Sequence, residues 1–134
     1  MANALYDAAR AAFLGGDLDW DGDTRLILID EADDTIDLAA DDFLDDRAAP
    51  SRVATSGAMT TKTKTAGVAD ADDVTLTSVT GDPSESVDCY RHTGTEATSN
   101  LIFNLDTATG LPVTPNGGNI TVQWDSGSNK IFKL

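Results

Sequence analysis

The sequence GDLDWDGDTRLILID, residues 16–30, joins an acidic turn to an unbroken apolar run. Leu26, Ile27, Leu28 and Ile29 favour extended structure, and the run is shorter than a typical helix. A short apolar run bounded by turn residues is typical of a strand that is covered on both faces. We therefore expect a buried β-strand here, with the rest of the fold packed on either side of it.

Residues 3–14, just before this stretch, have the pattern of an amphipathic helix. Asn3 is a suitable N-cap, and Gly15 with Gly16 gives a C-terminal stop. Four apolar residues follow the spacing of one buried helical face, and these are Leu5, Ala9, Ala12 and Phe13. The sequence thus predicts an N-terminal helix with a narrow, alanine-rich face that packs closely against its neighbour.

The chain after the apolar run changes from acidic to β-favouring. Residues 33–50 fit either a short helix near 40–46 or an irregular acidic loop, and Pro50 ends them. Beyond residue 50, short segments with strand-like composition alternate with turns. We expect strands within 74–79, 86–92, 100–106, 119–125 and 130–134. The turn SGSN between the last two predicts that they form a β-hairpin.

These elements together indicate a mainly β protein with an N-terminal helix. Six to eight short strands at this spacing are typical of a small antiparallel sandwich or barrel. The length of 134 residues supports a single domain. We divide it into the N-terminal helix (1–16), an acidic loop with the first strand (17–49) and a β-rich body (50–134), in which 54–69 is a candidate mobile arm.

The charge of the chain excludes several classes of partner. It has 23 acidic and 9 basic residues, for a net charge of -14. Nucleic acids and anionic membranes should repel such a chain, so we expect neither as a partner. The single cysteine, Cys89, cannot form an intrachain disulfide. The start of the chain has no secretory pattern and no run long enough to cross a bilayer, so we expect synthesis in a cytoplasm.

The acidic turn itself is a candidate cation site. Its aspartates alternate in the D-x-D-x-D-G pattern that opens an EF-hand calcium loop, and they are Asp17, Asp19, Asp21 and Asp23. The twelfth position, which supplies a bidentate acid in an EF-hand, is Leu28, and a strand rather than a helix follows. Two interpretations stay open: a calcium site of another kind, or an acidic turn in which Gly22 supplies a positive φ.

No constellation of catalytic residues is visible in the sequence. Cys89 and His92 are three residues apart at a strand end, where we expect a buried thiol and a surface imidazole. His92 is the sole histidine, and the chain has neither a nucleophile elbow nor a phosphate-binding glycine loop. We therefore predict that the protein is not an enzyme. Trp20, inside the acidic turn, is expected to anchor that turn to the core.

Three stretches carry a resemblance to known proteins, and they are MANALYDAARAAFLGGDLDWDGDT (1–24), RVATSGAMTTKTKTAGVADADDVT (52–75) and TATGLPVTPNGGNITVQWDSGSNKIFKL (107–134). Together they resemble one family of small virion structural proteins of tailed bacteriophages. Within that family the chain is most similar to capsid decoration, or cement, proteins, which are not linked to catalysis. The segment DEADDTIDLAADDFLDD (30–46) is more acidic than the resemblance implies.

The resemblance implies a place on the outer capsid surface, where the protein binds the major capsid protein and stabilises the head. It also implies a homo-oligomer, for which a trimer is one arrangement. Two alternatives remain: a tail or head-completion component, and a calcium-dependent binding or adhesion module. The second of these follows from the aspartate turn rather than from the resemblance.

Overall fold

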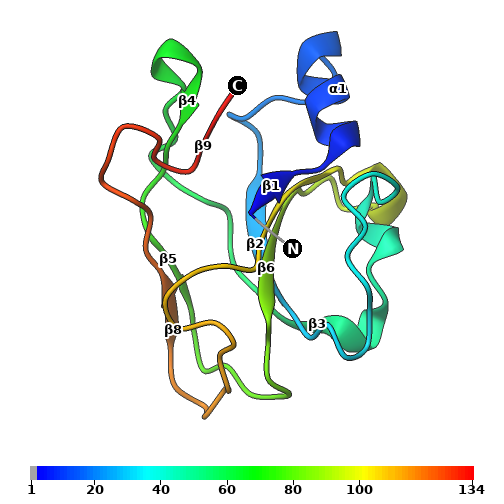
Figure 1. The fold of residues 1–134 in the computed structure, drawn as a ribbon, viewed down its shortest axis with the longest axis vertical. Helices are drawn as coiled ribbons and strands as arrows, with labels where there is room; N and C mark the ends of the chain where they lie inside the picture. Colours follow the sequence, from blue (N-terminus) through cyan, green and yellow to red (C-terminus); the bar gives the residue numbers. More distant parts are fainter. Residues whose placement is uncertain (1–2) are drawn as a thin grey trace.

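The protein is mainly β, as the sequence predicts (Figure 1). The computed structural model describes residues 3–134, so the first two residues of the predicted helical segment 1–16 lie outside the described residues. These described residues form nine antiparallel strands and one α-helix, in chain order β1 Ala4–Leu5, α1 Asp7–Gly15, β2 Thr24–Ile29, β3 Arg52–Thr55, β4 Val68–Ala69, β5 Val74–Leu76, β6 Ser86–Arg91, β7 Leu101–Leu105, β8 Ile120–Val122 and β9 Phe132–Lys133.

A five-stranded sheet in the order β1-β7-β6-β2-β3 forms the centre of the fold. The apolar run of residues 26–29 lies within β2 and is almost fully buried, which confirms the expected strand. Directly opposed residues in antiparallel strands point to the same face of a sheet. Leu26, Cys89 and Phe103 are opposed and define one face, which we call the ribbon face. Ile27, Asp88 and Asn104 are opposed and define the other, which we call the acidic face.

Two short β-ribbons cover the ribbon face. β5 pairs with β8, and β4 pairs with β9. In Figure 1 both ribbons lie on the left of the central sheet. The ring of Phe132 on β9 lies 5.3 Å from that of Trp20 and 5.9 Å from those of Phe13 and Phe103. Buried aromatic side chains contribute large apolar areas, so this cluster joins α1, the acidic turn, β7 and β9.

The irregular segment 30–51 covers the acidic face. It contains single-turn 3-10 helices at Leu44–Asp46 and Ala49–Ser51, so the irregular-loop alternative fits better than a helix over 40–46. Aspartate side chains stabilise its turns: Asp37 accepts from the backbone of Ala39, and Asp46 accepts from that of Asp42. Such local bonds compete with regular helix, which explains the irregular path. The remaining 3-10 turns are Thr65–Gly67 and Glu96–Thr98.

Two local predictions are wrong. Asn3 is not the N-cap of α1; Tyr6 is, and the Asn3 carboxamide oxygen accepts hydrogen bonds from the backbone of Asp106 and Thr107 instead. The segments 119–125 and 130–134 do not form a hairpin with each other, because β8 pairs with β5 and β9 pairs with β4. Long-range apolar packing therefore overrides the turn signal of SGSN.

The segment 54–69 was expected as a candidate mobile arm. Its first residues run alongside β2 and form hydrogen bonds with it. The backbone N–H groups of Ser56 and Met59 donate to the carbonyl oxygens of Leu26 and Thr24, and the Met59 side chain is buried. In residues 3–134, no helix has the length and hydropathy that a bilayer crossing requires.

Candidate functional site

The aspartates of the acidic turn form ion pairs and hydrogen bonds within the protein. Asp21 forms an exposed ion pair with Lys64. Asp23 pairs with Arg25 at 2.8 Å, and the hydrogen bond from Arg25 lowers the pKa of the Asp23 carboxyl. The Asp19 carboxylate accepts a hydrogen bond from the backbone N–H of Asp21. Three of the four predicted ligand carboxylates thus have bonding partners within the protein.

Lys62 and Arg91 also contact the acidic turn. The Lys62 ammonium donates to the carbonyl oxygen of Gly22, and its nitrogen lies 5.9 Å from the centroid of the Trp20 ring. Burial lowers the pKa of Lys62. The φ angle of Gly22 is not positive, so that part of the turn interpretation is wrong. A Cβ at Gly22 would overlap the Arg91 guanidinium, so a larger residue there would displace that side chain.

These contacts leave the calcium interpretation as a prediction. A cation bound by Asp19 and Asp21 would take the place of the Lys64 ammonium, and the Gly22 carbonyl already accepts from Lys62.

Trp20 is only 5 % exposed and packs edge-on against Phe132, which confirms its expected role as an anchor. Asp17 closes the helix through its backbone N–H, which donates to the carbonyl oxygen of Ala12.

A second acidic cluster was missed by sequence reasoning. Carboxylate oxygens of Asp30, Asp33 and Asp82 lie within 4.8 Å of one another. Asp30 is buried and accepts a hydrogen bond from the backbone of Ala32, whereas Asp33 and Asp82 are exposed. Asp82 comes from a turn far along the chain, and no local pattern could have placed it beside the other two.

The acidic face contains a buried charged network. The Arg47 side chain is fully buried and forms ion pairs with Asp34 at 3.3 Å, with Asp88 at 3.5 Å, and with Asp41. The Asp88 carboxylate also accepts hydrogen bonds from the Tyr6 hydroxyl at 2.6 Å and the Asn104 amide at 2.9 Å.

Burial and the polar partners of Asp88 have opposite effects on the pKa of its carboxyl. Burial raises the pKa of the Asp88 carboxyl to about 6, although Tyr6, Asn104 and Arg47 all lower it. Burial also raises the pKa of the Tyr6 hydroxyl. Because this network joins the start of α1, β6 and β7 to the irregular segment, we interpret it as structural.

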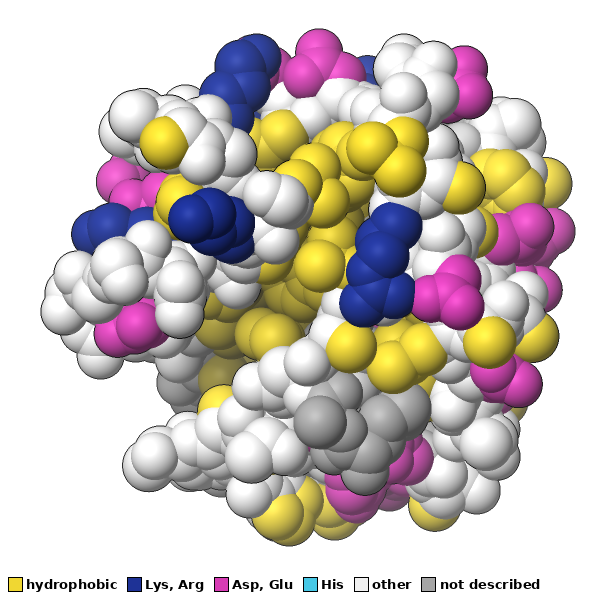
Figure 2. Space-filling model, turned by 45° about the horizontal axis from the view of Figure 1, so that its top comes forward, with side chains coloured by type: hydrophobic (Ala, Val, Ile, Leu, Met, Phe, Trp, Pro, Cys, Tyr) yellow, Lys and Arg dark blue, Asp and Glu magenta, His cyan; other side chains and the backbone are white. Residues whose placement is uncertain are grey.

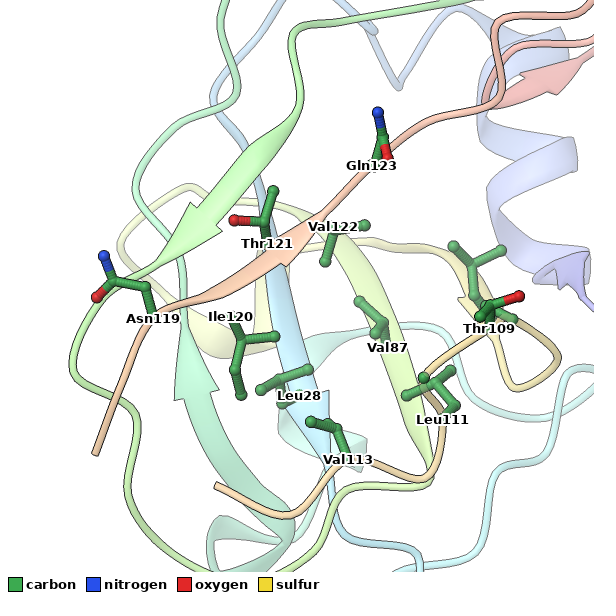
Figure 3. A pocket seen from close by; sticks show the side chains of 13 residues that line it. Leu28, Val87, Thr109, Leu111, Val113, Asn119, Ile120, Thr121, Val122 and Gln123 are labelled. Atoms are coloured by element: carbon green, nitrogen blue, oxygen red, sulfur yellow. The ribbon is translucent and has the colours of Figure 1, made fainter. Parts of the chain in front are cut away.

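An apolar pocket of about 350 Å³ lies between the ribbon face and β8 (Figure 3). Leu28 and Val87 from the central sheet face Ile120 and Val122 of β8 across it. None of the described residues that line it has an ionisable side chain. Among the described residues β8 pairs with β5 alone, so the edge of β8 that borders this pocket has unpaired backbone groups.

A polar pocket of about 260 Å³ contains His92, Arg52 and Glu96. The Arg52 guanidinium pairs with the Glu96 carboxylate at 2.7 Å and also donates to the carbonyl oxygens of Leu44 and Arg47. Arg52 therefore has a structural role.

Cys89 is fully buried on the ribbon face, and burial raises the pKa of its thiol, so it stays protonated and inert.

A third hollow, of about 210 Å³, lies between α1, the acidic turn and the β4–β9 ribbon. Phe13, Trp20 and Phe132 line it, together with Asp19, Lys64 and Leu134. Figure 2 shows this side of the molecule, with hydrophobic side chains gathered in a depression and Lys and Arg side chains on both sides of it. A smaller apolar hollow of about 100 Å³ adjoins it through Phe132.

Comparison with known proteins adds no identification. A scan of the chain against models of protein families finds no match. A search of curated proteins finds no significantly similar sequence. The functional inferences below therefore depend on the residues and geometry of this chain, together with the resemblance given above.

Proposed function

We propose that the protein is a structural component of a tailed-phage virion, and that it acts as a capsid decoration protein. In this role it binds the major capsid protein on the outer surface of the head and stabilises the shell. The proposal is supported by the resemblance of residues 1–24, 52–75 and 107–134 to that family. The mainly β fold agrees with what that resemblance implies.

The observation that carries the proposal is the open edge of β8 beside an apolar pocket. An unpaired edge can accept an additional strand from a partner, and the adjoining pocket can receive alternate side chains of that strand. The pocket has no ionisable group to act as an acid, a base or a charged anchor for substrate. This combination suits attachment to another protein better than catalysis.

The charge distribution is consistent with the same role. A net charge of -14 suits the outside of a shell, away from the packaged nucleic acid. Weak contacts repeated over a symmetric shell give strong attachment, because linked sites raise the effective concentration of each other. A homo-oligomer, such as a trimer, would link the sites in this way. No nucleic acid or membrane contact is part of the proposal.

Two alternatives predict different results. A tail or head-completion component would occur in few copies in each particle. A calcium-dependent adhesion module would use the aspartate turn, and the cationic contacts of Asp21 and Asp23 argue against it.

Quantitative mass spectrometry of purified particles tests the proposal. We expect the protein in amounts comparable to the major capsid protein, and loss of the protein should make heads rupture more readily on heating or chelation. A few copies in each particle would favour the tail or head-completion role. Absence of the protein from washed particles would exclude a virion function altogether.

A further inference from the structure

The β5–β8 ribbon is built from uncharged sequence in a strongly charged chain. Charged residues make up 24% of the whole, yet residues 107–124, which contain β8, have none and are the longest such segment. Residues 74–81, which contain β5, also have none. The pairing of β5 with β8 joins the two segments into one surface. Depletion of charged residues is the compositional mark of the centre of a protein–protein interface.

The free edge of β8 lacks the features that protect other strand edges. Natural proteins block exposed edges with charged side chains, with proline or with very short strands. The two edge strands of the central sheet follow this rule, because β3 begins with Arg52 and β1 has 2 residues. By contrast, β8 has the sequence Ile-Thr-Val, with neither a charge nor a proline. Its edge is therefore suited to accept another strand.

The apolar pocket beside this edge has the form of a slot. Leu111 and Val113 line the side across from β8 (Figure 3). Five apolar side chains of the lining stay partly exposed, and they are Leu105, Leu111, Val113, Ile120 and Val122. Of the described residues that line the slot, none belongs to β5. The free edge of β8, rather than that of β5, is therefore the one at which an added strand would cover apolar surface.

The backbone of β8 indicates what kind of group fits the slot. Alternate residues of β8 direct their N–H and C=O groups to β5, and the others direct theirs to the free edge. An added strand pairs with that ladder, whereas a small apolar molecule does not. Residues opposed to Ile120 and Val122 would point to the same face as they do, toward Leu28 and Val87. The slot thus suits an extended polypeptide with apolar side chains at every second position.

Three carboxylates lie at the Trp124 end of the ribbon. Asp72 and Asp73 directly precede β5, and Asp125 follows Trp124. The Trp124 indole donates to the Asp72 carbonyl oxygen at 3.1 Å, and its backbone N–H donates to the Asp73 carboxylate at 3.0 Å, so both residues lie beside the end of β8. All three aspartates are exposed, and none has an ion pair within the described part of the chain. A cation at this end of an added strand would be attracted to them.

The same charges disfavour a second copy of the chain as the occupant. Another copy has the same net charge of -14, and its own β8 segment, residues 107–124, contains no cation. Like charges repel, so a partner with basic residues beside an uncharged strand is the better match. Strand pairs in the described residues are all antiparallel, and parallel pairing is slightly less stable. In an antiparallel pair, the N-terminal end of the added strand lies at the Trp124 end of β8.

We propose that the free edge of β8 binds an extended segment of a partner protein, antiparallel to β8, with Lys or Arg at the segment's N-terminal end beside Asp72, Asp73 and Asp125. The residues that follow are uncharged, and every second one places an apolar side chain in the slot. This inference deepens the proposed function and rests on it for the identity of the partner, which would be a subunit of the shell. The chemistry of recognition does not depend on that identity.

A peptide titration followed by ¹⁵N NMR tests the inference. The probe is the synthetic peptide Lys-Arg-Thr-Val-Thr-Ile-Thr-Val-Thr with both ends blocked. At millimolar peptide we expect saturable shifts of the backbone amides of Ile120, Thr121 and Val122 and of the Trp124 indole. Amide hydrogen exchange should also slow at alternate residues of β8, because their N–H groups become paired. A side chain bound in the slot without strand pairing would not slow it.

Three control peptides separate the parts of the proposal. The first has Asp-Asp in place of Lys-Arg and should bind much more weakly. In the second, proline replaces the central Ile, which removes an N–H and an apolar side chain, so it should not bind. The third has the probe's sequence reversed, which moves the basic pair to the C-terminal end, and it should bind more weakly than the probe.

Matched variants of the protein locate the charged contact. Asp72→Asn, Asp73→Asn and Asp125→Asn together should weaken binding of the probe about tenfold, because asparagine keeps the hydrogen-bond acceptors and removes the charges. The control variant changes three other exposed aspartates to asparagine and alters the net charge equally, and these are Asp17, Asp33 and Asp45. It should leave the affinity nearly unchanged. The NMR spectrum of each variant reports whether it folds.

Several results would overturn the inference. Shifts confined to other surfaces would move the contact away from β8, and equal binding of any control peptide would remove the feature which that peptide lacks. An equal loss of affinity in the two triple variants would reduce the charge contact to attraction by the whole molecule. Shifts along β8 that depend on protein concentration without peptide would assign the edge to a second copy.

These results are independent of particle abundance. Failure of the peptide to bind, with abundant protein in particles, would leave the virion role intact and place the contact elsewhere. Binding of the peptide by a protein that is absent from particles would keep the β8 edge as a binding site and exclude a shell subunit as its partner.

Discussion

At the residue scale, Arg47 is the side chain on which the acidic face depends. It is fully buried and surrounded by the carboxylates of Asp34, Asp41 and Asp88. A buried charge is tolerable only when it is paired, and removal of one partner leaves the others uncompensated. The sequence gives no sign of this role, because an arginine after DDFLDD would be expected on a solvated surface.

Arg47→Met should lower the free energy of unfolding by about 3–5 kcal/mol, because three carboxylates then lose their shared cation. Urea denaturation followed by tryptophan fluorescence measures the change. The matched control is Arg10→Met, because Arg10 forms an exposed ion pair with Asp7. This substitution should change the free energy of unfolding by at most about 0.5 kcal/mol. Equal effects of the two substitutions would contradict the structural role of Arg47.

Asp88 gives a prediction for the dependence of stability on pH. Its pKa is raised from 3.8 to about 6 in the folded protein, so the folded state binds the proton more tightly than the unfolded state does. The stabilisation by the neutral carboxyl is complete below pH 3.8 and is lost as the pH rises through about 6.

The comparison of wild type with Asp88→Asn isolates this effect, because other titrating groups cancel. The free energy of unfolding of wild type, minus that of the variant, should fall by roughly 3 kcal/mol between low pH and neutral pH. Urea denaturation at a series of pH values measures it. A difference that rises with pH would show that Arg47 and the hydrogen bonds dominate over burial.

At the element scale, the acidic turn between α1 and β2 is where the calcium prediction is decided. If the turn binds calcium, the ion replaces the Lys64 ammonium beside Asp21. Because the ion binds the folded protein and not the unfolded chain, it stabilises the folded state. Calcium should then raise the melting temperature, and a chelator should reverse the rise. Asp19→Asn combined with Asp21→Asn should abolish the response. An unchanged melting temperature in millimolar calcium would exclude the site.

The elements differ in how far local sequence determines them. β2 was predictable because its apolar run needs no knowledge of its neighbours. The pairing of β8 with β5 and of β9 with β4 was not, since it depends on packing between segments about 45 to 65 residues apart in the chain. The same holds for the turn: its aspartates were visible, but Lys62, Lys64 and Arg91, whose cationic groups contact it, come from distant segments.

At the scale of the whole molecule, the excess negative charge should lower the stability of the folded protein when salt does not screen it. A net charge of -14 on 134 residues produces self-repulsion in the compact state. Raising NaCl from about 0.01 M to about 1 M shortens the Debye length from about 30 Å to about 3 Å, so the melting temperature should rise.

Differential scanning calorimetry across this salt range measures the effect. A variant with Asp33, Asp45 and Asp82, all exposed, each changed to Asn should be more stable than wild type at low salt and gain less from added salt. A melting temperature that falls with salt would mean that local ion pairs, rather than repulsion, dominate the electrostatics of the fold.

Electron cryomicroscopy of intact particles tests the central claim most directly, since it gives both the position and the copy number of the chain. The account predicts density for this fold on the outer surface of the head, repeated with the symmetry of the shell and in contact with the major capsid protein. Particles whose heads lack this density, or in which the fold is found solely at the neck or tail, would contradict it.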